Sequence, residues 1–389
     1  MSPPPSPGSG PADCVVVGGG VVGTALAYEL ACRGATTVLV DRHDRGRATD
    51  AGAGILSPET NLDPESGAFA VGCAAARHYE ELVARLAEDG VVDTGYGQPG
   101  SLLVAERPGD DEVMAEAVRL VRARAPRTEE VEPEEARRHF PLLGTVRRAL
   151  FNPDGRRVDG RVLRAALEQA AQMHGVRIER ASALGIDGDR SSGVVRAVRT
   201  DDGDIPTSAV AIAGGAWTSE LAGAFGVTLP VRPLKGQIVH LGLPDADSSG
   251  WTIVQPVLGF YLVPWPGGRV ACGGTMEPEA GFDHRVTADG VHQLLRECLR
   301  TAPGLAGAEV IDVRVGSRPV SADGLPLLGR VSGWSDVVVA TGHGTEGLLL
   351  GPLSAGVAAD LVLGRTAEPA GEESVARELA RWSPGRFGP

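Results

Sequence analysis

The sequence predicts a two-domain α/β protein, in which a nucleotide-binding domain with a parallel sheet is joined to a second domain with an antiparallel sheet. Three observations lead to this prediction: a strand–turn–helix–strand unit near the N-terminus, a length of 389 residues with 42% hydrophobic content, and a later region in which strands alternate with turns. A chain longer than about 250–300 residues usually divides into more than one core. The two domains are expected to be discontinuous in sequence.

The N-terminal unit spans residues 13–41, DCVVVGGGVVGTALAYELACRGATTVLVD. Its β-branched run predicts a buried strand, which is followed by helical periodicity and a second apolar strand. Gly18, Gly20 and Gly23 have the G-x-G-x-x-G spacing, and Asp41 ends the second strand. The complete context favours a dinucleotide-binding unit over a glycine-rich turn that merely lets a helix cross a sheet. In such a unit the helix N-terminus holds a pyrophosphate and the acid accepts from ribose hydroxyls.

Composition argues against several classes of protein. A formal net charge of -13 opposes nucleic acid and anionic membrane surfaces as partners, so a small-molecule partner is expected. The five cysteines are odd in number and never have C-x-x-C spacing, so neither a disulfide framework nor a metal site is predicted. Free cysteines in turn suggest a reducing, cytoplasmic location. Residues 1–11 lack the features of a signal peptide and are expected to be a disordered tail. No stretch is apolar enough to span a membrane.

Apolar periodicity and glycine content place further elements along the chain. Helices are predicted over residues 69–89, 110–123, 129–140 and 158–175, and a buried strand over residues 209–213. The Gly/Ala-rich stretch 45–61 predicts a loop whose backbone approaches a bulky group, with an ordinary flexible loop as the alternative.

Aromatic residues concentrate in the region of alternating strands and turns, where Trp251, Phe260, Tyr261 and Trp265 lie close together in sequence. They either pack on the core of a sheet or line a cavity. Neighbouring residues on a strand face opposite sides, so one of Phe260 and Tyr261 faces such a cavity. Tyr261 is the better candidate, because its hydroxyl needs a partner when buried. Lys235, the single lysine of the chain, is either a site residue or a surface lysine.

A second glycine-rich turn, residues 342–347, follows a predicted buried strand and precedes an apolar helix. A second helix N-terminus is therefore expected beside the first. It would suit a group that gains negative charge, such as the pyrimidine end of a reduced flavin. Arg318, directly before Pro319, is either a site residue or a solvated arginine.

With these motifs in this order, the chain resembles the FAD-dependent amine oxidases that include glycine oxidase, sarcosine oxidase and D-amino-acid oxidase. It looks most similar to glycine-oxidase-like proteins. The resemblance rests on DCVVVGGGVVGTALAYELACRG, AGAGILSP, AVAIAGGAWTSEL, PLKGQIVHL, YLVPWPGGRVACGGTMEP, SRPVSADGLPLLG and VVVATGHGTEGLLLGP. It implies a Rossmann-type FAD-binding domain of residues 12–88, 150–224 and 312–370, a substrate domain with an antiparallel sheet of residues 89–149 and 225–311, and a C-terminal tail of residues 371–389.

The resemblance also implies roles for individual residues. Arg318 would bind the substrate carboxylate with its planar fork and Tyr261 would assist it, while Lys235 and Glu346 complete the expected catalytic set. No cysteine or histidine is placed by motif to attach the flavin, so FAD is expected to bind non-covalently. The expected cofactor-binding residues are Gly18, Gly20, Val21, Val22, Gly23, Asp41, Arg42, Gly54, Ile55, Leu56, Leu184, Ala213, Gly214, Gly215, Trp217, Gly342, His343, Gly344, Thr345, Glu346 and Gly347.

Two positions depart from the glycine-oxidase pattern. The last turn reads His343-Gly344-Thr345-Glu346 where these enzymes usually carry Arg-Asn after the His-aromatic pair, and Gly259 stands where they carry a polar histidine. Both changes lie on the pocket side and argue against plain glycine as the substrate. Glu346 either reaches the amine side of the pocket or points outward.

The expected activity is oxidation of a small amino-acid-like amine: a glycine-like compound, an N-substituted glycine or a D-amino acid. A hydride passes to flavin N5, the imine hydrolyses, and O2 reoxidises the flavin and forms H2O2. One alternative is a flavin dehydrogenase of a 2-hydroxy acid or glycerol phosphate with a non-oxygen acceptor, and another is a nucleotide-binding sensor without activity. The sequence leaves open which amine is oxidised and whether the chain forms a homo-oligomer.

Overall fold

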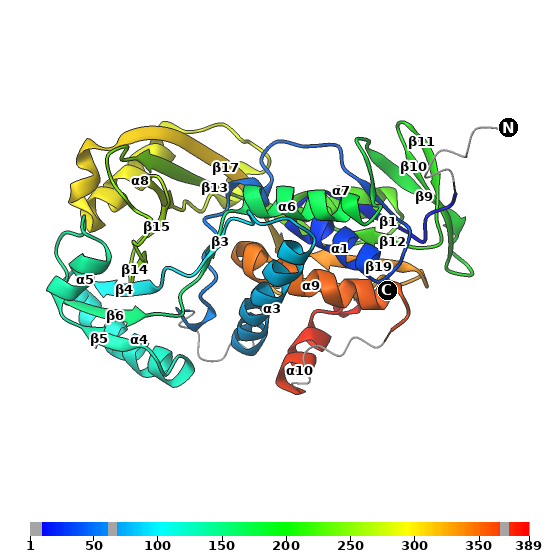
Figure 1. Ribbon diagram of the computed structural model, residues 1–389. Coiled ribbons are helices and arrows are strands. Elements are labelled where there is room, and N and C mark those ends of the chain that lie inside the picture. The colour runs from blue at the N-terminus through cyan, green and yellow to red at the C-terminus, as the bar shows by residue number, and fades with distance from the viewer. Residues whose placement is uncertain (1–9, 61–67, 366–372, 389) are drawn as a thin grey trace.

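The computed structural model describes residues 10–60, 68–365 and 373–388. The first nine residues, which make up most of the predicted disordered tail, lie outside this range. Figure 1 shows one part of the molecule around a sheet flanked by helices and another around a long twisted sheet. Both parts draw on segments that are far apart in sequence, as expected for a discontinuous two-domain protein. No helix in the described ranges combines the length and the apolar character that a membrane crossing needs.

The first part is built on a six-stranded sheet with the order β18-β19-β12-β1-β2-β8. Neighbouring strands run parallel, except that β18 is antiparallel to β19. This is the doubly wound arrangement in which ligands bind beyond the carboxyl ends of the strands. The strands are β1 (Cys14–Val17), β2 (Thr37–Val40), β8 (Arg177–Glu179), β12 (Val210–Ile212), β18 (Leu327–Arg330) and β19 (Val337–Thr341).

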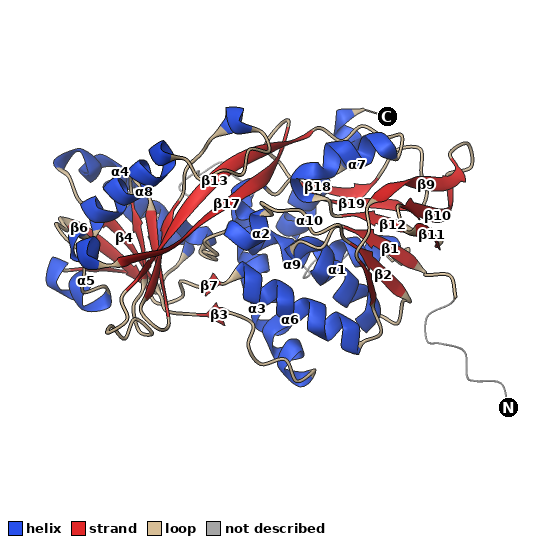
Figure 2. Ribbon diagram, turned by 90° about the horizontal axis from the view of Figure 1, so that it is seen from above, coloured by secondary structure: helices blue, strands red, loops and turns tan. Residues whose placement is uncertain are grey.

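Both faces of this sheet are covered, which explains why its strands are apolar along their whole length. One face packs on α1 (Val21–Cys32), α3 (Ala68–Glu88), α6 (Gly160–Met173) and α9 (Gly347–Val362). The other face packs on α7 (Thr218–Ala224) and on a small antiparallel sheet of β9 (Ala183–Asp189), β10 (Val194–Thr200) and β11 (Gly203–Pro206). Figure 2 shows these layers from above.

The second part is an eight-stranded sheet with the order β17-β13-β16-β15-β14-β4-β6-β5. All neighbours are antiparallel except β14 and β4. The strands are β4 (Ser101–Ala105), β5 (Glu129–Val131), β6 (Arg148–Asn152), β13 (Val231–Gly242), β14 (Ile253–Pro256), β15 (Tyr261–Trp265), β16 (Arg269–Gly273) and β17 (Glu309–Ser321). The boundary expected at residue 312 falls inside β17, whose whole length pairs with β13.

Helices cover this sheet as well. Residues of α8 (Ala288–Thr301) and α5 (Pro133–His139) share one hydrophobic cluster with the sheet, and residues of α4 (Asp111–Arg124) share another. The remaining α-helices and strands of the described residues are α2 (Ala48–Ala51), the short pair β3 (Tyr96–Gly97) and β7 (Arg157–Val158), and α10 (Glu373–Arg381).

Two segments differ from the sequence-based expectation. The single helix predicted over residues 129–140 is wrong in its first half, because Glu129–Val131 forms edge strand β5 and the helix begins at Pro133. Exposed charged residues are typical of an edge strand, and a proline fits the first helical position. The C-terminal segment forms α10, and Trp382 after it is only 1% exposed in the core that covers the six-stranded sheet.

Candidate active site

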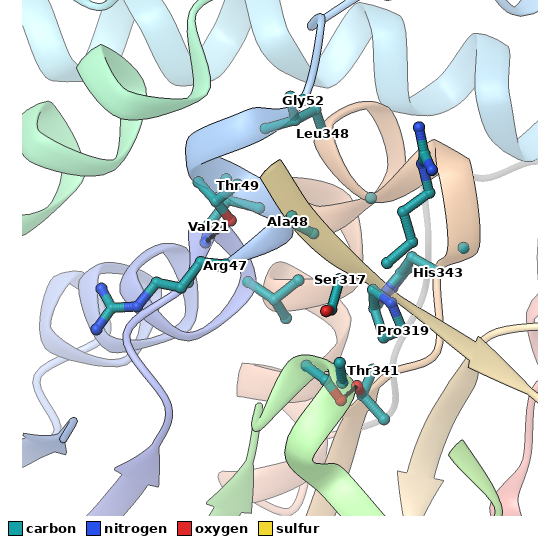
Figure 3. Close-up of a pocket in the computed structure, with 18 of the residues that line it drawn as sticks. Val21, Arg47, Ala48, Thr49, Gly52, Ser317, Pro319, Thr341, His343 and Leu348 are labelled. Atoms are coloured by element: carbon teal, nitrogen blue, oxygen red, sulfur yellow. Dashed lines mark hydrogen bonds between the residues drawn. The ribbon is translucent and has the colours of Figure 1, made fainter. Parts of the chain in front are cut away.

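A cavity of about 560 Å3 lies where the two parts meet. One side is formed by the ends of β1, β2, β12 and β19 and by the start of α9, and the other by residues of β13, β15 and β17. Figure 3 shows Ala48 and Thr49 near Ser317, and here the segment packs directly on β17, since the Ser317 amide donates to Gly46 O at 2.8 Å. The cavity thus joins the carboxyl edge of the parallel sheet to one face of the large sheet.

The glycine-rich turn between β1 and α1 requires glycine for steric reasons. Gly18 has φ +112°, and a Cβ there would lie 2.4 Å from Ala213 O. At Gly23 a Cβ would meet Gly18 O at 1.8 Å, and at Gly19 it would meet the Asp41 carboxylate at 2.4 Å. The turn is therefore packed backbone against backbone. Gly20, Val21 and Val22 at the start of α1 line the cavity, where the first amides of a helix have no intrahelical acceptor.

Asp41 lies at this turn, as predicted, but it also has a protein partner. Arg47 Nη2 is 2.6 Å from Asp41 Oδ2, and Arg47 Nη1 donates to Gly19 O at 3.4 Å. Thr49 Oγ1 accepts from the Val21 amide at 3.0 Å and so caps the start of α1. No motif in the sequence pointed to Arg47 or Thr49, although both belong to the Gly/Ala-rich stretch 45–61.

The loop after α2 brings Gly54 to the cavity. Gly54 has φ +77°, and a Cβ there would lie 1.7 Å from Val158 O. Gly54 and Ile55 line the cavity, whereas Leu56 is fully buried in the core beside it. Gly54 therefore permits a close approach of this loop to the Val158 backbone, and the approach to a bulky ligand that the sequence predicts stays a prediction.

The second glycine-rich turn, before α9, also reaches the cavity. Residues 343–350 line it, and Gly342 and Gly344 have φ +76° and +54°. His343 is 4% exposed, its Nε2 lies 2.9 Å from Ser354 Oγ, and burial lowers its pKa to about 4. His343 is thus neutral at physiological pH, and the turn presents a helix N-terminus without a protonated side chain at this position.

Arg318 and Tyr261 lie together on the opposite wall. A Cβ added at Gly274 would lie 3.1 Å from both Arg318 Nη2 and Tyr261 Oη, so the guanidinium and the hydroxyl meet at this residue. Arg318 Nη1 donates to Thr275 O at 3.0 Å. In the described part of the chain, no carboxylate forms an ion pair with Arg318. A guanidinium that faces a cavity without an acidic partner is suited to an anionic ligand.

The hydroxyl of Tyr261 stays protonated at neutral pH. Burial raises its pKa to about 12, although the nearby Arg318 guanidinium acts in the opposite direction. The hydroxyl can therefore donate a hydrogen bond to the same ligand that Arg318 binds.

Glu346 is the acidic residue of this cavity nearest to that pair. It lines the cavity, and its carboxylate lies close enough to Tyr261 to contribute to the raised pKa of the tyrosine. Glu346 is exposed to solvent, yet protein atoms surround much of its carboxyl group. This burial raises the carboxyl pKa of Glu346, although a 3.3 Å hydrogen bond from Thr345 Oγ1 opposes the effect. Of the two orientations left open by the sequence, the place of Glu346 in the cavity lining favours the one that faces the cavity, which stays a prediction.

Lys235 requires a correction. It was expected to face the cavity or to lie on the surface, but it is 1% exposed and its Nζ lies 3.1 Å from Glu277 Oε2. Gly236 and Ile238 of the same strand line the cavity, so Lys235 is on the opposite face of β13. Lys235 therefore does not contact a ligand in this cavity.

The other expected cofactor residues divide into two groups. Leu184 does not line the cavity; its side chain is 53% exposed on β9, while residues 181–183 just before it do line the cavity. Gly23, Leu56 and Gly342 lie behind the wall. The cavity brings together Gly18, Gly20, Val21, Val22, Asp41, Arg42, Gly54, Ile55, Ala213, Gly214, Gly215, Trp217, His343, Gly344, Thr345, Glu346 and Gly347.

The arrangement fits a flavin adenine dinucleotide. The Gly18 turn leaves no space for a side chain and places helix amides where a pyrophosphate binds. The acid at the end of β2 suits a ribose, and a second helix N-terminus lies on the same cavity, where the other end of the dinucleotide would be held. The glycine turn, the acid and both helix N-termini all belong to residues that the structure describes.

Comparison with known proteins agrees with this fit. A family model described as FAD dependent oxidoreductase (DAO) matches residues 13–361. The chain is 34% identical over 358 residues to the uncharacterized oxidoreductase YurR of Bacillus subtilis, covering 91% of this chain and 95% of the relative. It is 33% identical to the glycine oxidase of Pseudomonas aeruginosa, covering 90% of this chain and 94% of the relative.

Among solved structures, iminodiacetate oxidase (IdaA) from Chelativorans sp. BNC1 has a TM-score of 0.88 at 33% identity, covering 95% of this chain and 98% of the other. The family match, the relatives and the glycine cradle agree on the predicted fold class and cofactor. The chain belongs to the DAO family of FAD-dependent oxidoreductases, and FAD is its cofactor.

Proposed function

We propose that this protein is an oxidase of a small amino-acid-like amine with a free carboxylate: an N-substituted glycine, a D-amino acid or a related glycine-like compound. The observation that carries the proposal is the Arg318 guanidinium, which has no acidic partner among the described residues and lies beside the Tyr261 hydroxyl. The planar fork of an arginine binds a carboxylate with two parallel hydrogen bonds. The cavity that holds this pair also holds the glycine cradle for FAD.

Glu346 favours an amine over a hydroxyl as the group to be oxidised. An amino acid arrives largely as the ammonium form, which must lose a proton before the carbon beside it can lose a hydride. A carboxylate in the same cavity as the arginine can bind that ammonium group and accept its proton, and a raised pKa makes the carboxylate a better base. Arg318 then holds the acid end of the substrate and Glu346 its amine end.

When bound, FAD supplies the hydride acceptor and a route by which two electrons reach O2. The residues of this chain orient the substrate rather than carry out the redox step. Arg318 and Tyr261 fix the carboxylate, Glu346 takes one proton, and the α carbon loses a hydride. The resulting imine hydrolyses to an oxo acid and the free amine, and O2 with two electrons and two protons gives H2O2.

Glu346 also bears on the substituent at nitrogen. The structural neighbour is named for iminodiacetate, a glycine whose nitrogen carries a second carboxymethyl group. In this chain a second carboxylate would meet the like charge of an ionised Glu346 unless it reached Arg42 or Arg47 elsewhere in the wall. We therefore propose that neutral N-substituents, or those that donate hydrogen bonds, are preferred to a second acid.

The test is anaerobic bleaching of the bound flavin by glycine, N-methylglycine, iminodiacetate, D-alanine and lactate, followed by admission of air and assay of H2O2. Rapid bleaching by one of the amino acids, with peroxide formed in air, supports the proposal. Bleaching by lactate alone, or rapid reduction without peroxide, supports the dehydrogenase alternative. A flavin that responds only to dithionite would indicate a protein without this activity.

We further propose that FAD is held non-covalently. The cysteines of the chain (Cys14, Cys32, Cys73, Cys272 and Cys298) do not line the cavity, and His343, which does, is already 2.9 Å from Ser354. Acid precipitation should release yellow FAD into the supernatant. Flavin that stays with the denatured polypeptide would contradict this proposal.

A further inference from the structure

A buried polar network lies behind the wall that carries Arg318. Its members are Lys235, Gln237, Thr275 and Glu277, and the first three are 1%, 0% and 2% exposed. Lys235 is the single lysine of the chain, and its Nζ is 3.1 Å from Glu277 Oε2. The activity proposed above assigns no role to this group. A buried cation needs a specific reason, because removing an ammonium group from water is costly.

The second oxygen of Glu277 is directed at Thr275. Glu277 Oε1 accepts from Thr275 Oγ1 at 2.7 Å and from Gln237 Nε2 at 2.7 Å. Burial works to raise the pKa of the Glu277 carboxyl, but these two hydrogen bonds and the Lys235 ammonium outweigh it and lower the pKa. Glu277 is therefore an ionised acceptor that holds the Thr275 hydroxyl.

Thr275 in turn contacts Arg318. Its amide donates to Gln237 O at 3.1 Å, and its hydroxyl accepts from the Gln237 amide at 2.8 Å. Its carbonyl accepts from Arg318 Nη1 at 3.0 Å. A continuous chain of contacts thus runs from the Lys235 ammonium through Glu277 and Thr275 to the guanidinium that faces the cavity.

We propose that the Lys235–Glu277 pair, acting through Thr275, positions Arg318 for the substrate carboxylate. This inference rests on the carboxylate-binding role of Arg318 proposed above. An arginine side chain loses conformational freedom when it binds a ligand, and a guanidinium already fixed by a backbone carbonyl loses less. Lys235, Glu277 and Thr275 are positioning residues, because they act on the substrate only through Arg318.

The choice of lysine agrees with this role. The ammonium is a compact charge that a single carboxylate can satisfy, whereas a guanidinium presents five donors that a closed site would leave partly unpaired. Lys235 also lies on the face of β13 away from the cavity, so it fixes Glu277 without adding a second cation beside the substrate.

The first experiment removes the hydrogen bond between the Thr275 hydroxyl and Glu277. Thr275→Val keeps the shape and the backbone carbonyl but removes the hydroxyl, and Thr275→Ser keeps the hydroxyl. The Kd of acetate, measured from the absorbance of the bound flavin, and the KM of the best substrate should both rise about 5- to 10-fold in Thr275→Val, as expected for one lost hydrogen bond. The kcat should change less than about twofold, and Thr275→Ser should restore wild-type values.

A network that only supports the fold would lower the thermal stability of Thr275→Val and leave acetate binding unchanged, which would overturn the proposal.

The second experiment uses the single lysine as a reporter that does not depend on turnover. Protein labelled with 13C-lysine should give one side-chain ε signal, which acetate should shift in the wild type but not in Thr275→Val or Arg318→Met. If acetate binds but the lysine signal does not shift, Lys235 is not coupled to Arg318. The proposed role of Arg318 in binding the carboxylate would still stand. Failure of acetate to bind the wild type at all would overturn both the carboxylate clamp and this inference.

Discussion

The two walls of the cavity are built by different means. The wall expected to hold FAD is lined largely by backbone, with glycine turns at Gly18, Gly54 and Gly344. The wall that we propose binds the substrate, called the substrate wall below, presents side chains, chiefly Arg318 and Tyr261, from strands of the large sheet. At Gly18 and Gly54 an added Cβ would collide with other backbone, so this wall is restricted sterically at these two turns. The substrate wall acts through charge and hydrogen bonds. The loss of function caused by a substitution there should therefore depend on how much charge and how many hydrogen bonds the substitution removes.

The strongest test of this contrast is Gly18→Ala. The added Cβ would lie 2.4 Å from Ala213 O at φ +112°, so the turn must move and the purified protein should contain little or no FAD. Gly34→Ala is a matched control, since Gly34 has φ +86° but no heavy atom within 4 Å of the added Cβ. Its cost should be about 1 kcal/mol in the free energy of unfolding, with full flavin content. Flavin absorbance and melting temperature measure both effects, and equal flavin content in the two variants would contradict the steric account.

On the substrate wall, Arg318→Met should leave FAD bound but raise the substrate KM. Loss of a bidentate charge-assisted contact costs roughly 2–4 kcal/mol, or about 30- to 1,000-fold. Arg232→Met is the control, because Arg232 is exposed on the neighbouring strand β13 and does not line the cavity. Steady-state kinetics on the best substrate give the comparison. Similar KM values in the two variants would remove Arg318 from the substrate site.

Glu346 should impose a pH dependence on this wall. Its folded pKa is raised above that of an ordinary glutamate, so the carboxylate that accepts the proton forms only as the pH rises through this higher value. The kcat/KM should therefore fall on the acid side, with a limb above the usual range for glutamate. Glu346→Gln should remove that limb and lower kcat/KM roughly 10-fold at pH 7, with a smaller loss where the free amine already predominates. An unchanged pH profile would show that Glu346 takes no proton from the substrate.

The contrast between the walls also explains what the sequence could reveal. Steric demands select glycine at fixed spacings, so the cradle around Gly18 and the helix that follows could be predicted, and the fold class and FAD are confirmed. The sequence indicates less clearly which side chains reach the cavity. Arg47 and Thr49 belong to a loop that was recognised, but only the four-residue helix α2 decides which of its side chains turn inward.

Strand parity accounts for the residues that were misplaced. Sequence alone did not show which face of β13 meets the cavity, and with Gly236 and Ile238 on that face Lys235 has to lie on the other. Leu184 directly follows residues 181–183, which line the cavity, but its own side chain is exposed. The strand Glu129–Val131 was hidden because its two glutamates carry no apolar alternation.

Tyr261→Phe should have the smallest effect on the substrate wall, and it tests whether this wall is graded. The substitution removes one hydrogen-bond donor and keeps the ring, which packs with Ile55 and Ile238 in a small hydrophobic cluster. Because the pKa of Tyr261 is raised to about 12, the hydroxyl is a neutral donor across the pH range of the assay, and its loss should cost about 1 kcal/mol. We expect the substrate KM to rise roughly 5-fold, with kcat and flavin content nearly unchanged. An effect as large as that of Arg318→Met would mean that the hydroxyl and the guanidinium act as one unit. The substrate wall would then be as intolerant as the backbone wall, and the contrast between the two would fail.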